Sequence, residues 1–377
     1  MSSPKFIPVC EPSLIGNEKK YVLDCLETNW ISSAGSYVDR FENEFAQYCG
    51  VAHGVSCSNG TTALHLAMLS LGIKKDDEVI VPNYTMVASL LAILYVGAIP
   101  VFIDVEADTG NIDSELIEQS ITPKTKAIMV VHLFGHPCDM DPIIKIAKKH
   151  KLFTIEDAAE AHGATYKGKK VGNLSDIACF SFYGNKLITT GEGGMVITNL
   201  DKLAKQSRYY KNLCFPVDGP RNYQHQDIGY NYRLTNIQAA LGVAQLENID
   251  RFISARRDNA KRYNQGLSDI EGLQLPIEKD YAQNVYWMYT VYVDEKKFGM
   301  NRDQLMEKLQ EKGIGTRKVF YPLHRQPLLK KITTSTNQKF PVTDKLSETG
   351  LYLPSGSGLQ KSDQDRIIDA LHKIASK

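Results

Sequence analysis

The chain has 377 residues, a hydrophobic content of 43% and a formal net charge of +1, from 44 Lys and Arg against 43 Asp and Glu. A charge this balanced argues against a protein that binds nucleic acid or a membrane surface, because no broad basic surface attracts polyanions. The length exceeds one ordinary hydrophobic core, so we expect a large domain at 1–245 and a smaller C-terminal domain at 246–377.

Two features of the first hundred residues bear on localisation. The N-terminal stretch "MSSPKFIPVCEPS" has no uninterrupted apolar core of the kind found in signal peptides. The run from Thr85 to Ile103 is uncharged and long enough to suggest a membrane span. It contains Gly97 and Pro100, however, which favour a buried helix followed by a buried strand. We therefore expect a cytoplasmic protein.

The middle of the chain alternates between short apolar runs and helical patterns. The runs are rich in β-branched and aromatic residues and lie at 78–83, 99–105, 127–135, 152–159 and 177–184. Helical patterns lie between them, among them "TTALHLAMLSLGI" and "DPIIKIAKKHK", for which Asp141 is the expected N-cap residue. Apolar strands separated by helices predict an α/β fold with a mostly parallel mixed sheet between helices.

The C-terminal part has a different character. A long helical pattern begins near Asn236 and suits a connection between domains. The stretch 286–293 alternates like a half-exposed strand, and helices are expected at 302–313 and 363–375. These patterns predict a smaller α+β domain after the large one.

A single lysine stands out in "SFYGNKLITTGEGGMV", between a strand-like run and a glycine-rich turn. An amine at this place can condense with an aldehyde when desolvation lowers its pKa. Ligand sites of parallel sheets lie at the carboxyl ends of the strands, and both Asp157 and Lys186 follow apolar runs. The alternative for Lys186 is an ordinary solvated lysine.

Three further motifs accompany this lysine. In "SNGTTALHL" a Gly-Thr pair opens a helix and could bind a phosphate, or form an ordinary helix cap. In "IEDAAEAHGA" Asp157 needs a cationic or hydrogen-bonding partner, or caps the next helix. "GYNYRLTN" is polar and aromatic, and could be a loop packed under the helix that follows. An anion site, a carboxylate and a lysine at successive strand ends are the parts that hold pyridoxal phosphate.

These motifs resemble the sugar aminotransferases of the DegT/DnrJ/EryC1/StrS family, within the fold-type-I pyridoxal-phosphate enzymes. The resemblance covers essentially the full length, from "GNEKKYVLDCLETNWISSAGSYVDRFENEFAQYCG" through "GHPCDMDP" to "YPLHRQP" and "LPSGSGL". It is strongest to members that aminate a 4-keto-6-deoxy nucleotide sugar. It implies a transaminase of surface polysaccharide biosynthesis (O-antigen or capsule) with L-glutamate as donor. It also implies a homodimer with shared active sites.

The resemblance assigns the cofactor site. Lys186 matches the lysine that carries the cofactor, Asp157 the acid at the pyridine nitrogen, and Glu160 the partner of the ring hydroxyl. Met86 stands where many relatives stack an aromatic ring, and its polarizable sulfur can cover the same face. The phosphate ligands match Gly60, Thr61, Ser181 and, from the neighbouring subunit, Asn231.

The resemblance also offers a substrate site, composed of Trp30, Ser33, Trp287, Arg317 and His324. Trp30 and Trp287 could instead be packing residues, and Arg317 could form a surface ion pair. His324 lies between two prolines in a polar-aromatic loop, which is a poor place for a core histidine. The segment 212–228 departs from the arginine- and tryptophan-rich stretch expected of such relatives. A smaller phosphorylated ketone or a different keto-sugar nucleotide therefore stays open as the acceptor. No clustered His/Asp set in the sequence predicts a metal site.

Overall fold

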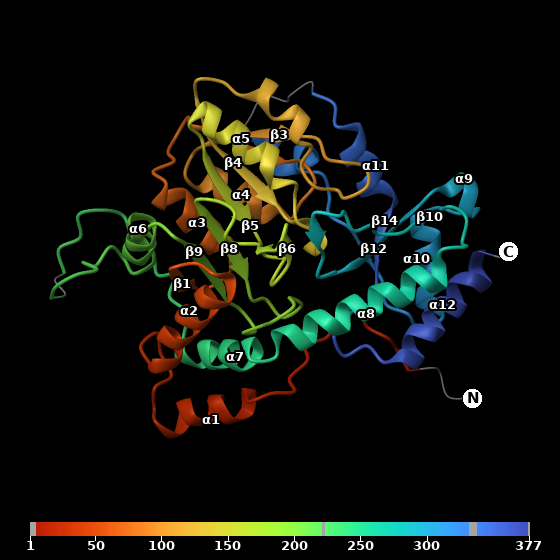
Figure 1. Cartoon of the computed structure of the whole chain (residues 1–377), viewed down its shortest axis with the longest axis horizontal. Coiled ribbons are helices and arrows are strands. Elements are labelled where there is room, and N and C mark those ends of the chain that lie inside the picture. Colours follow the sequence, from red (N-terminus) through yellow and green to blue (C-terminus); the bar gives the residue numbers. More distant parts are fainter. Residues whose placement is uncertain (1–4, 221–222, 332–337, 376–377) are drawn as a thin grey trace.

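A seven-stranded sheet forms the centre of the protein (Figure 1). The computed structural model describes residues 5–220, 223–331 and 338–375. The strand order across the sheet is β1 (His53–Cys57), β9 (Gly194–Thr198), β8 (Ile177–Ser181), β5 (Phe153–Asp157), β4 (Thr125–Val131), β2 (Glu78–Pro82) and β3 (Ile99–Ile103). Only β9 runs antiparallel to its neighbours in this sheet. The predicted mostly parallel mixed sheet is therefore confirmed.

Helices cover both faces of this sheet. One face packs against α3 (Gly60–Ser70), α4 (Val87–Tyr95) and α6 (Asp201–Lys211). The opposite face packs against α2 (Ser36–Cys49), α5 (Met140–His150) and α7 (Asn236–Leu246), while α1 (Glu18–Glu27) lies outside α7. Strands covered on both sides are mostly apolar, which explains the hydrophobic runs in β4 and β8, whereas β5 ends in the buried carboxylates of Glu156 and Asp157.

The uncharged run from 85 to 103 divides as predicted into a helix, α4, and a strand, β3. Gly97 lies between them with a positive φ of 74°, a conformation that glycine adopts at no steric cost. Across the described ranges, no helix combines the length and the apolar character needed to cross a membrane.

One helix start differs from the prediction. Helix α5 begins at Met140, and its N-cap residue is Asp139 rather than Asp141. The Asp139 carboxylate accepts a hydrogen bond from the Tyr166 hydroxyl at 2.6 Å instead of capping the helix. Asp141 lies in the first turn, where its negative charge complements the helix dipole.

The C-terminal part has its own antiparallel sheet, ordered β10 (Leu273–Gln274), β12 (Tyr289–Val293), β14 (Gly350–Leu353) and β13 (Arg317–Lys318). The predicted helices are confirmed as α10 (Arg302–Glu311) and α12 (Lys361–Ala375). The prediction of a half-exposed strand is wrong, because all five residues of β12 are buried. Val291 faces the C-terminal core, while Tyr292 packs on the other side against residues beside the central sheet.

The long helical pattern after Asn236 consists of two helices, α7 and α8 (Ile249–Leu267). Phe252 near the start of α8 packs in the core of the central sheet, and Tyr263 near its end packs in the C-terminal core. The N-terminal segment also joins the C-terminal part, since Ile7 pairs with Ile314 in a parallel bridge. These contacts tie the two parts together, and the boundary between 245 and 246 stays a prediction.

A second connection between the two parts is made by buried Asp104. Its carboxylate accepts hydrogen bonds from the backbone N–H groups of Val342 and Thr343 and from the Thr343 hydroxyl, at 2.7 to 3.1 Å. It thereby caps helix α11 (Pro341–Thr349), because the first N–H groups of a helix have no partner within it.

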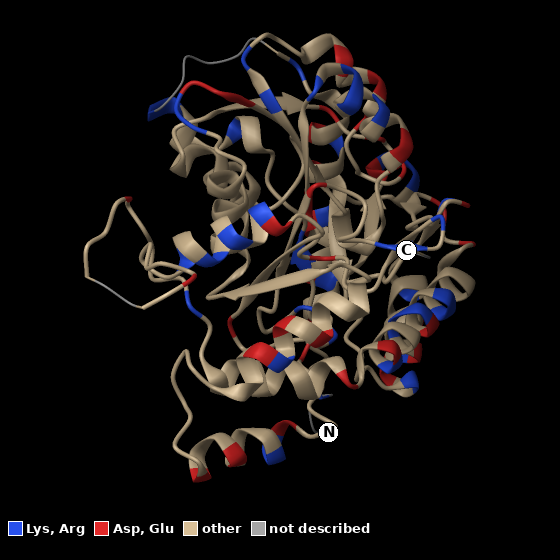
Figure 2. Cartoon of the chain, turned by 60° about the vertical axis from the view of Figure 1, so that its left-hand side comes forward, with Lys and Arg blue, Asp and Glu red and all other residues tan. Residues whose placement is uncertain are grey.

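Figure 2 shows Lys and Arg mixed with Asp and Glu over the outer helices.

The remaining elements are short. They are β6 (Thr165–Tyr166), β7 (Lys169–Lys170) and β11 (Ala282–Gln283), which form a third sheet, with α9 (Glu295–Phe298) and the 3-10 turns η1 (Ser114–Leu116), η2 (Glu118–Ser120), η3 (Leu133–Gly135), η4 (Leu323–Arg325) and η5 (Pro327–Lys331).

Candidate active site

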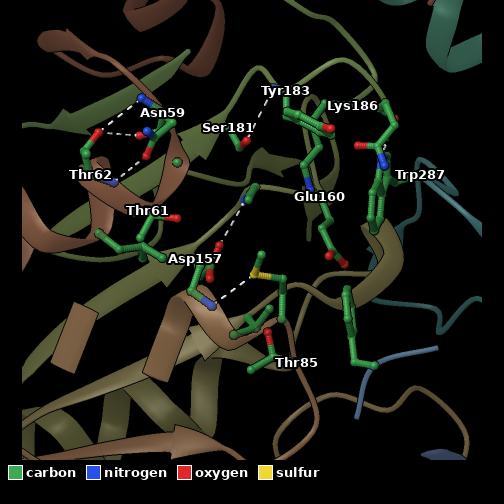
Figure 3. Close-up of a pocket in the computed structure, with 18 of the residues that line it drawn as sticks. Asn59, Thr61, Thr62, Thr85, Asp157, Glu160, Ser181, Tyr183, Lys186 and Trp287 are labelled. Carbon is green, nitrogen blue, oxygen red and sulfur yellow. Dashed lines mark hydrogen bonds between the residues drawn. The ribbon is translucent and has the colours of Figure 1, made fainter. Parts of the chain in front are cut away.

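A cavity of about 920 Å³ opens at the carboxyl ends of β5 and β8. One wall comes from the central sheet and the start of α3, and the other from the C-terminal part. Figure 3 shows Asn59, Thr61 and Thr62 on one side of this cavity and Lys186 with Trp287 on the other. The cavity is therefore a site shared by both parts of the chain.

The start of α3 forms an anion cradle. Asn59 is the N-cap residue, and its side chain accepts a hydrogen bond from the Thr62 N–H at 2.9 Å. The N–H groups of Gly60 and Thr61 have no intrahelical partner, because they lie in the first turn. Ser181 at the end of β8 faces Gly60 so closely that a Cβ on Gly60 would lie 2.6 Å from its Cβ. Gly60 thus lets the helix start pack against Ser181, and the free amides and the helix dipole at this end suit a phosphate.

We expect Gly60→Ala to weaken pyridoxal phosphate binding by about tenfold or more, because the added methyl group must displace Ser181 or the start of the helix. The measurement is a titration of the cofactor-free full chain with pyridoxal phosphate, followed by absorbance. Gly184→Ala is the matched control, since a Cβ at Gly184 meets nothing within 4 Å. Equal affinity of both variants would contradict the cradle.

Asp157 ends β5 and is buried at the floor of the cavity. Its carboxylate accepts a hydrogen bond from the Ser89 hydroxyl at 2.7 Å and one from the Ala159 N–H at 3.3 Å. Burial raises the pKa of Asp157, and the Ser89 hydrogen bond opposes this rise. A carboxylate held here by so few donors is suited to a protonated ring nitrogen, which would be its missing cationic partner.

Lys186 lies in the turn between β8 and β9, beside buried Glu160. Burial lowers the pKa of the Lys186 amine, although the negative charges of Glu160 and Asp157 act in the opposite direction. Burial likewise raises the pKa of Glu160 to about 7, against the charge of Lys186 and a hydrogen bond from the Phe134 N–H. An amine with a depressed pKa is a nucleophile near neutral pH.

The wall opposite the sheet is aromatic and comes from the C-terminal part. Trp287, Phe320 and Tyr352 line the cavity there, and Trp287 is only 4% exposed. The Tyr352 hydroxyl is buried and has no hydrogen-bond partner among the described residues. Arg317 and Lys318 of β13 line the mouth, and both are exposed. This end of the cavity offers an apolar surface, one free hydroxyl and positive charge.

The structure brings most of the sequence-predicted residues together in this cavity. Its lining includes Gly60, Thr61, Met86, Asp157, Glu160, Ser181, Lys186, Trp287 and Arg317. Met86 is 47% exposed, and its sulfur accepts a hydrogen bond from the Ala88 N–H at the start of α4.

Four of the predicted residues do not line the cavity. Trp30 is 58% exposed, and its loop, which also contains Ser33, is attached to the start of α7 by a hydrogen bond from the Asn236 side chain to the Trp30 carbonyl. Asn231 is exposed, so its expected role in a neighbouring subunit stays a prediction. The fourth residue is His324.

His324 is part of the contact between the two parts of the chain. The Nδ1 of its ring accepts a hydrogen bond from the Asn83 side-chain amide at 2.7 Å. The backbone N–H of His324 donates to the oxygen of the same side chain at 2.9 Å. Its ring packs on Phe340, with centroids 4.8 Å apart. These contacts give His324 a structural position behind the cavity wall.

Several residues in or behind the cavity wall carry no signal of their own in the sequence. Tyr352 lies in a short strand, and Ser89 lies inside the apolar helix α4. His65 and Tyr95 carry no such signal either, and they form an aromatic cluster with Tyr230 and Tyr232 of the "GYNYRLTN" motif. The sign that could have pointed to Ser89 is its place four residues after Thr85, which lies just before α4, and this spacing brings the two hydroxyls within 3.3 Å of each other.

The donor set fits pyridoxal phosphate: a phosphate cradle, a buried carboxylate for the ring nitrogen and an amine with a lowered pKa. Across the described ranges, no group of three or more His, Cys, Asp or Glu residues could hold a metal ion. The fold and the site together define a fold-type-I pyridoxal-phosphate enzyme.

The chain belongs to the DegT/DnrJ/EryC1/StrS aminotransferase family, whose model matches residues 12–372. It is 47% identical over 375 residues to GDP-perosamine synthase of Caulobacter vibrioides, covering 99% of this chain and 100% of the relative. It is 46% identical to GDP-perosamine synthase of Escherichia coli O157:H7, with 99% of each chain covered. The aminotransferase structure from Psychrobacter cryohalolentis superimposes with a TM-score of 0.90 at 33% identity, covering 98% of this chain and 99% of the other. The protein is thus a pyridoxal-phosphate-dependent aminotransferase.

Proposed function

We propose that the enzyme transfers an amino group from L-glutamate to a 4-keto-6-deoxy nucleotide sugar, as a GDP-perosamine synthase does, in surface polysaccharide biosynthesis. The observation that carries this proposal is the mouth of the cavity, where Arg317 extends the site beyond Lys186 and has no ion pair among the described residues. A guanidinium binds the diphosphate of a nucleotide sugar through paired hydrogen bonds. The aromatic wall of Trp287 and Phe320 offers an apolar face for the 6-deoxy end of the sugar.

Each residue of the cofactor site has a part in the reaction. When bound, pyridoxal phosphate supplies an aldehyde that accepts the amino group and a ring that withdraws electrons from the reacting carbon. Lys186 holds the cofactor and, once released, takes a proton from the donor and returns it one position away. Asp157 keeps a proton on the ring nitrogen through its negative charge. Gly60, Thr61 and Ser181 bind the phosphate and so fix the distance between ring and amine.

The enzyme acts as a homodimer in the cytoplasm under this proposal. Asn231 is exposed and lies next to Tyr230 and Tyr232, which do line the cavity of their own chain. It is therefore available to a second copy, where it would contact the phosphate. The position of Trp30 and Ser33 outside the cavity of their own chain suits the same arrangement. Sedimentation of the wild type and of Asn231→Asp tests whether the chain forms a dimer. The affinities of the two proteins for pyridoxal phosphate test whether Asn231 contacts the phosphate.

A half-reaction screen tests the substrate. The enzyme is loaded with L-glutamate, and recovery of the original cofactor spectrum is followed with keto-sugar nucleotides and with small phosphorylated ketones. We expect recovery with a GDP-linked 4-keto-6-deoxy sugar. Recovery with small phosphorylated ketones alone would overturn the proposal and favour the second candidate, to which the positive mouth is also suited.

We expect Arg317→Gln to slow this second half-reaction at low substrate by about ten- to a hundredfold, because one charged hydrogen-bond partner of the diphosphate is lost. The loss should appear mainly as a raised KM for the nucleotide sugar. Arg251→Gln, on the exposed face of α8, is the matched control. The same loss in the control, or an unchanged KM in Arg317→Gln, would contradict a role for Arg317 in substrate binding.

A further inference from the structure

The amine of Lys186 rests on an indole ring. Its Nζ lies 3.9 Å from the centroid of the Trp287 ring (Figure 3). The same indole donates a hydrogen bond from Nε1 to the carbonyl oxygen of Asn185 at 2.8 Å. Asn185 directly precedes Lys186, so one ring contacts both the backbone and the side chain of the segment that carries the amine.

The position of Trp287 is fixed from behind by the C-terminal part. Its carbonyl oxygen accepts a short hydrogen bond from Nη1 of Arg256 in α8, and Arg256 is only 2% exposed. Arg256 also donates to the Ser357 hydroxyl at 3.1 Å and approaches Cys10 Sγ at 3.3 Å. With its carbonyl and its ring nitrogen both bonded, the indole cannot turn away from Lys186 without breaking hydrogen bonds.

We propose that Trp287 is the resting place of Lys186, where the face of the indole holds the protonated amine whenever the lysine is not joined to the cofactor. A cation within about 6 Å of an indole centroid is attracted by the negative face of the ring, and Trp does this best among the aromatic residues. The proposal rests on the assignment of Lys186 as the lysine that carries the cofactor. It adds a role for Trp287 that contact with substrate alone would not give.

An indole suits this purpose better than another carboxylate would. The released lysine must hold a proton and then give it up again, so its proton affinity has to stay moderate. A direct ion pair raises the pKa of an amine strongly, whereas a neutral ring holds the amine in place with a weaker preference for its charged form. Trp287 therefore keeps Lys186 near the reacting carbon without trapping its proton.

Other charged and titratable groups also face Lys186. Glu160 and Asp157 lie on the sheet side, and both raise its pKa. His162 lies beside phenylalanine rings, and burial together with the positive charge of Lys186 lowers its pKa to about 3, so it is neutral throughout the working range. Burial holds the pKa of Tyr352 well above its usual range, so its hydroxyl is also neutral. Among these groups Glu160 is the one whose titration must be separated from that of Lys186.

The chain has only two tryptophans, Trp30 and Trp287, which makes a direct test available. In Trp30→Phe all tryptophan fluorescence comes from Trp287. We expect the emission of the cofactor-free full chain to rise in one step as the pH is raised, because an ammonium group against an indole quenches it and a neutral amine does so less. The step should disappear when Lys186→Met is added. A step that persists in Lys186→Met, or no step at all, would overturn the proposal.

Two further variants complete the test. Glu160→Gln should keep the step and move it to lower pH, since a charge that stabilises the ammonium is removed; loss of the step in this variant would assign the titration to Glu160 and overturn the proposal. Trp287→Phe should move the pH dependence of pyridoxal phosphate capture, followed by absorbance, about half a unit lower. Phe320→Leu opens the same wall without touching Lys186 and serves as the control for water entry.

The Trp287→Phe arm also separates this inference from the assignment of Lys186. An upward shift, or a shift shared with Phe320→Leu, would mean that the ring only excludes water. If Lys186→Met still formed the visible absorbance of the loaded enzyme, the assignment of Lys186 itself would fail. If only the fluorescence step were missing, the assignment would stand and the resting place alone would be wrong.

Discussion

Replacing Lys186 with methionine should abolish the visible absorbance of the bound cofactor and lower turnover by at least about 10⁴-fold. Methionine keeps a similar length and apolar stem but has no amine to join the cofactor or to move a proton, and a positioned proton-transfer group alone contributes up to about 10⁴ in rate. Lys186→Arg should fail in the same way, since a guanidinium stays protonated and is not a nucleophile at neutral pH. The measurements are an absorbance spectrum and a turnover assay with excess glutamate and acceptor.

The control for this prediction is Lys145→Met on the exposed face of α5, which also removes one surface amine. It should retain the spectrum and the rate of the wild type. A Lys186→Met enzyme that keeps the visible absorbance would show that another amine carries the cofactor.

Replacing Asp157 with asparagine should lower turnover by about 10²- to 10³-fold while the protein still binds the cofactor. Asparagine has the same shape and can accept the hydrogen bond from Ser89, but it carries no negative charge to keep the ring nitrogen protonated. The loss should appear in both half-reactions, because both pass through the same proton transfer. Single-turnover measurements with glutamate and with the keto acceptor check this.

Ser89→Ala is the graded companion to this variant. It removes the donor that lowers the pKa of Asp157, so the pKa rises further and a higher pH is needed to ionise the carboxylate. We expect the acid limb of the pH–rate profile to move to higher pH, with a smaller loss at its optimum than in Asp157→Asn. A profile that moves to lower pH, or equal losses in Ser89→Ala and Asp157→Asn, would contradict this role of Asp157.

The central sheet and the reactive end of the cavity could be predicted from the sequence because their signals are local. Each strand of the parallel part reads as a short apolar run, and Asp157 and Lys186 stand directly at or after such runs. Strand ends of a parallel sheet meet at one edge, so the closeness of these two residues follows from their places in the chain. The part of the cradle formed by Gly60 and Thr61 is local as well, since it depends on a helix start, whereas Ser181 comes from the end of β8.

The substrate end depends on contacts between residues far apart in the chain, and such contacts leave little trace in a single sequence. The resemblance and its loop favour His324 as a substrate residue, but its partner Asn83 lies 241 positions away and no local pattern shows this contact, so the substrate role stays a prediction. Tyr352 reaches the cavity only because β14 pairs with β12 and β13. The tyrosines of β12 make this strand look half-exposed in the sequence. In the structure they are buried by elements from both parts of the chain, which no local pattern shows.

The bridge between Ile7 and Ile314 has a consequence for synthesis on the ribosome. Ile7 donates to the Gly313 carbonyl and accepts from the Gly315 N–H, at 2.9 and 2.8 Å. Ile7 can therefore reach its final place only after Ile314, more than three hundred positions later in the chain, has been made. Contacts this distant close late and slowly. The nascent chain must hold its N-terminal segment unpaired until the C-terminal core arrives, and the same segment then carries Cys10 to the residues behind the catalytic lysine.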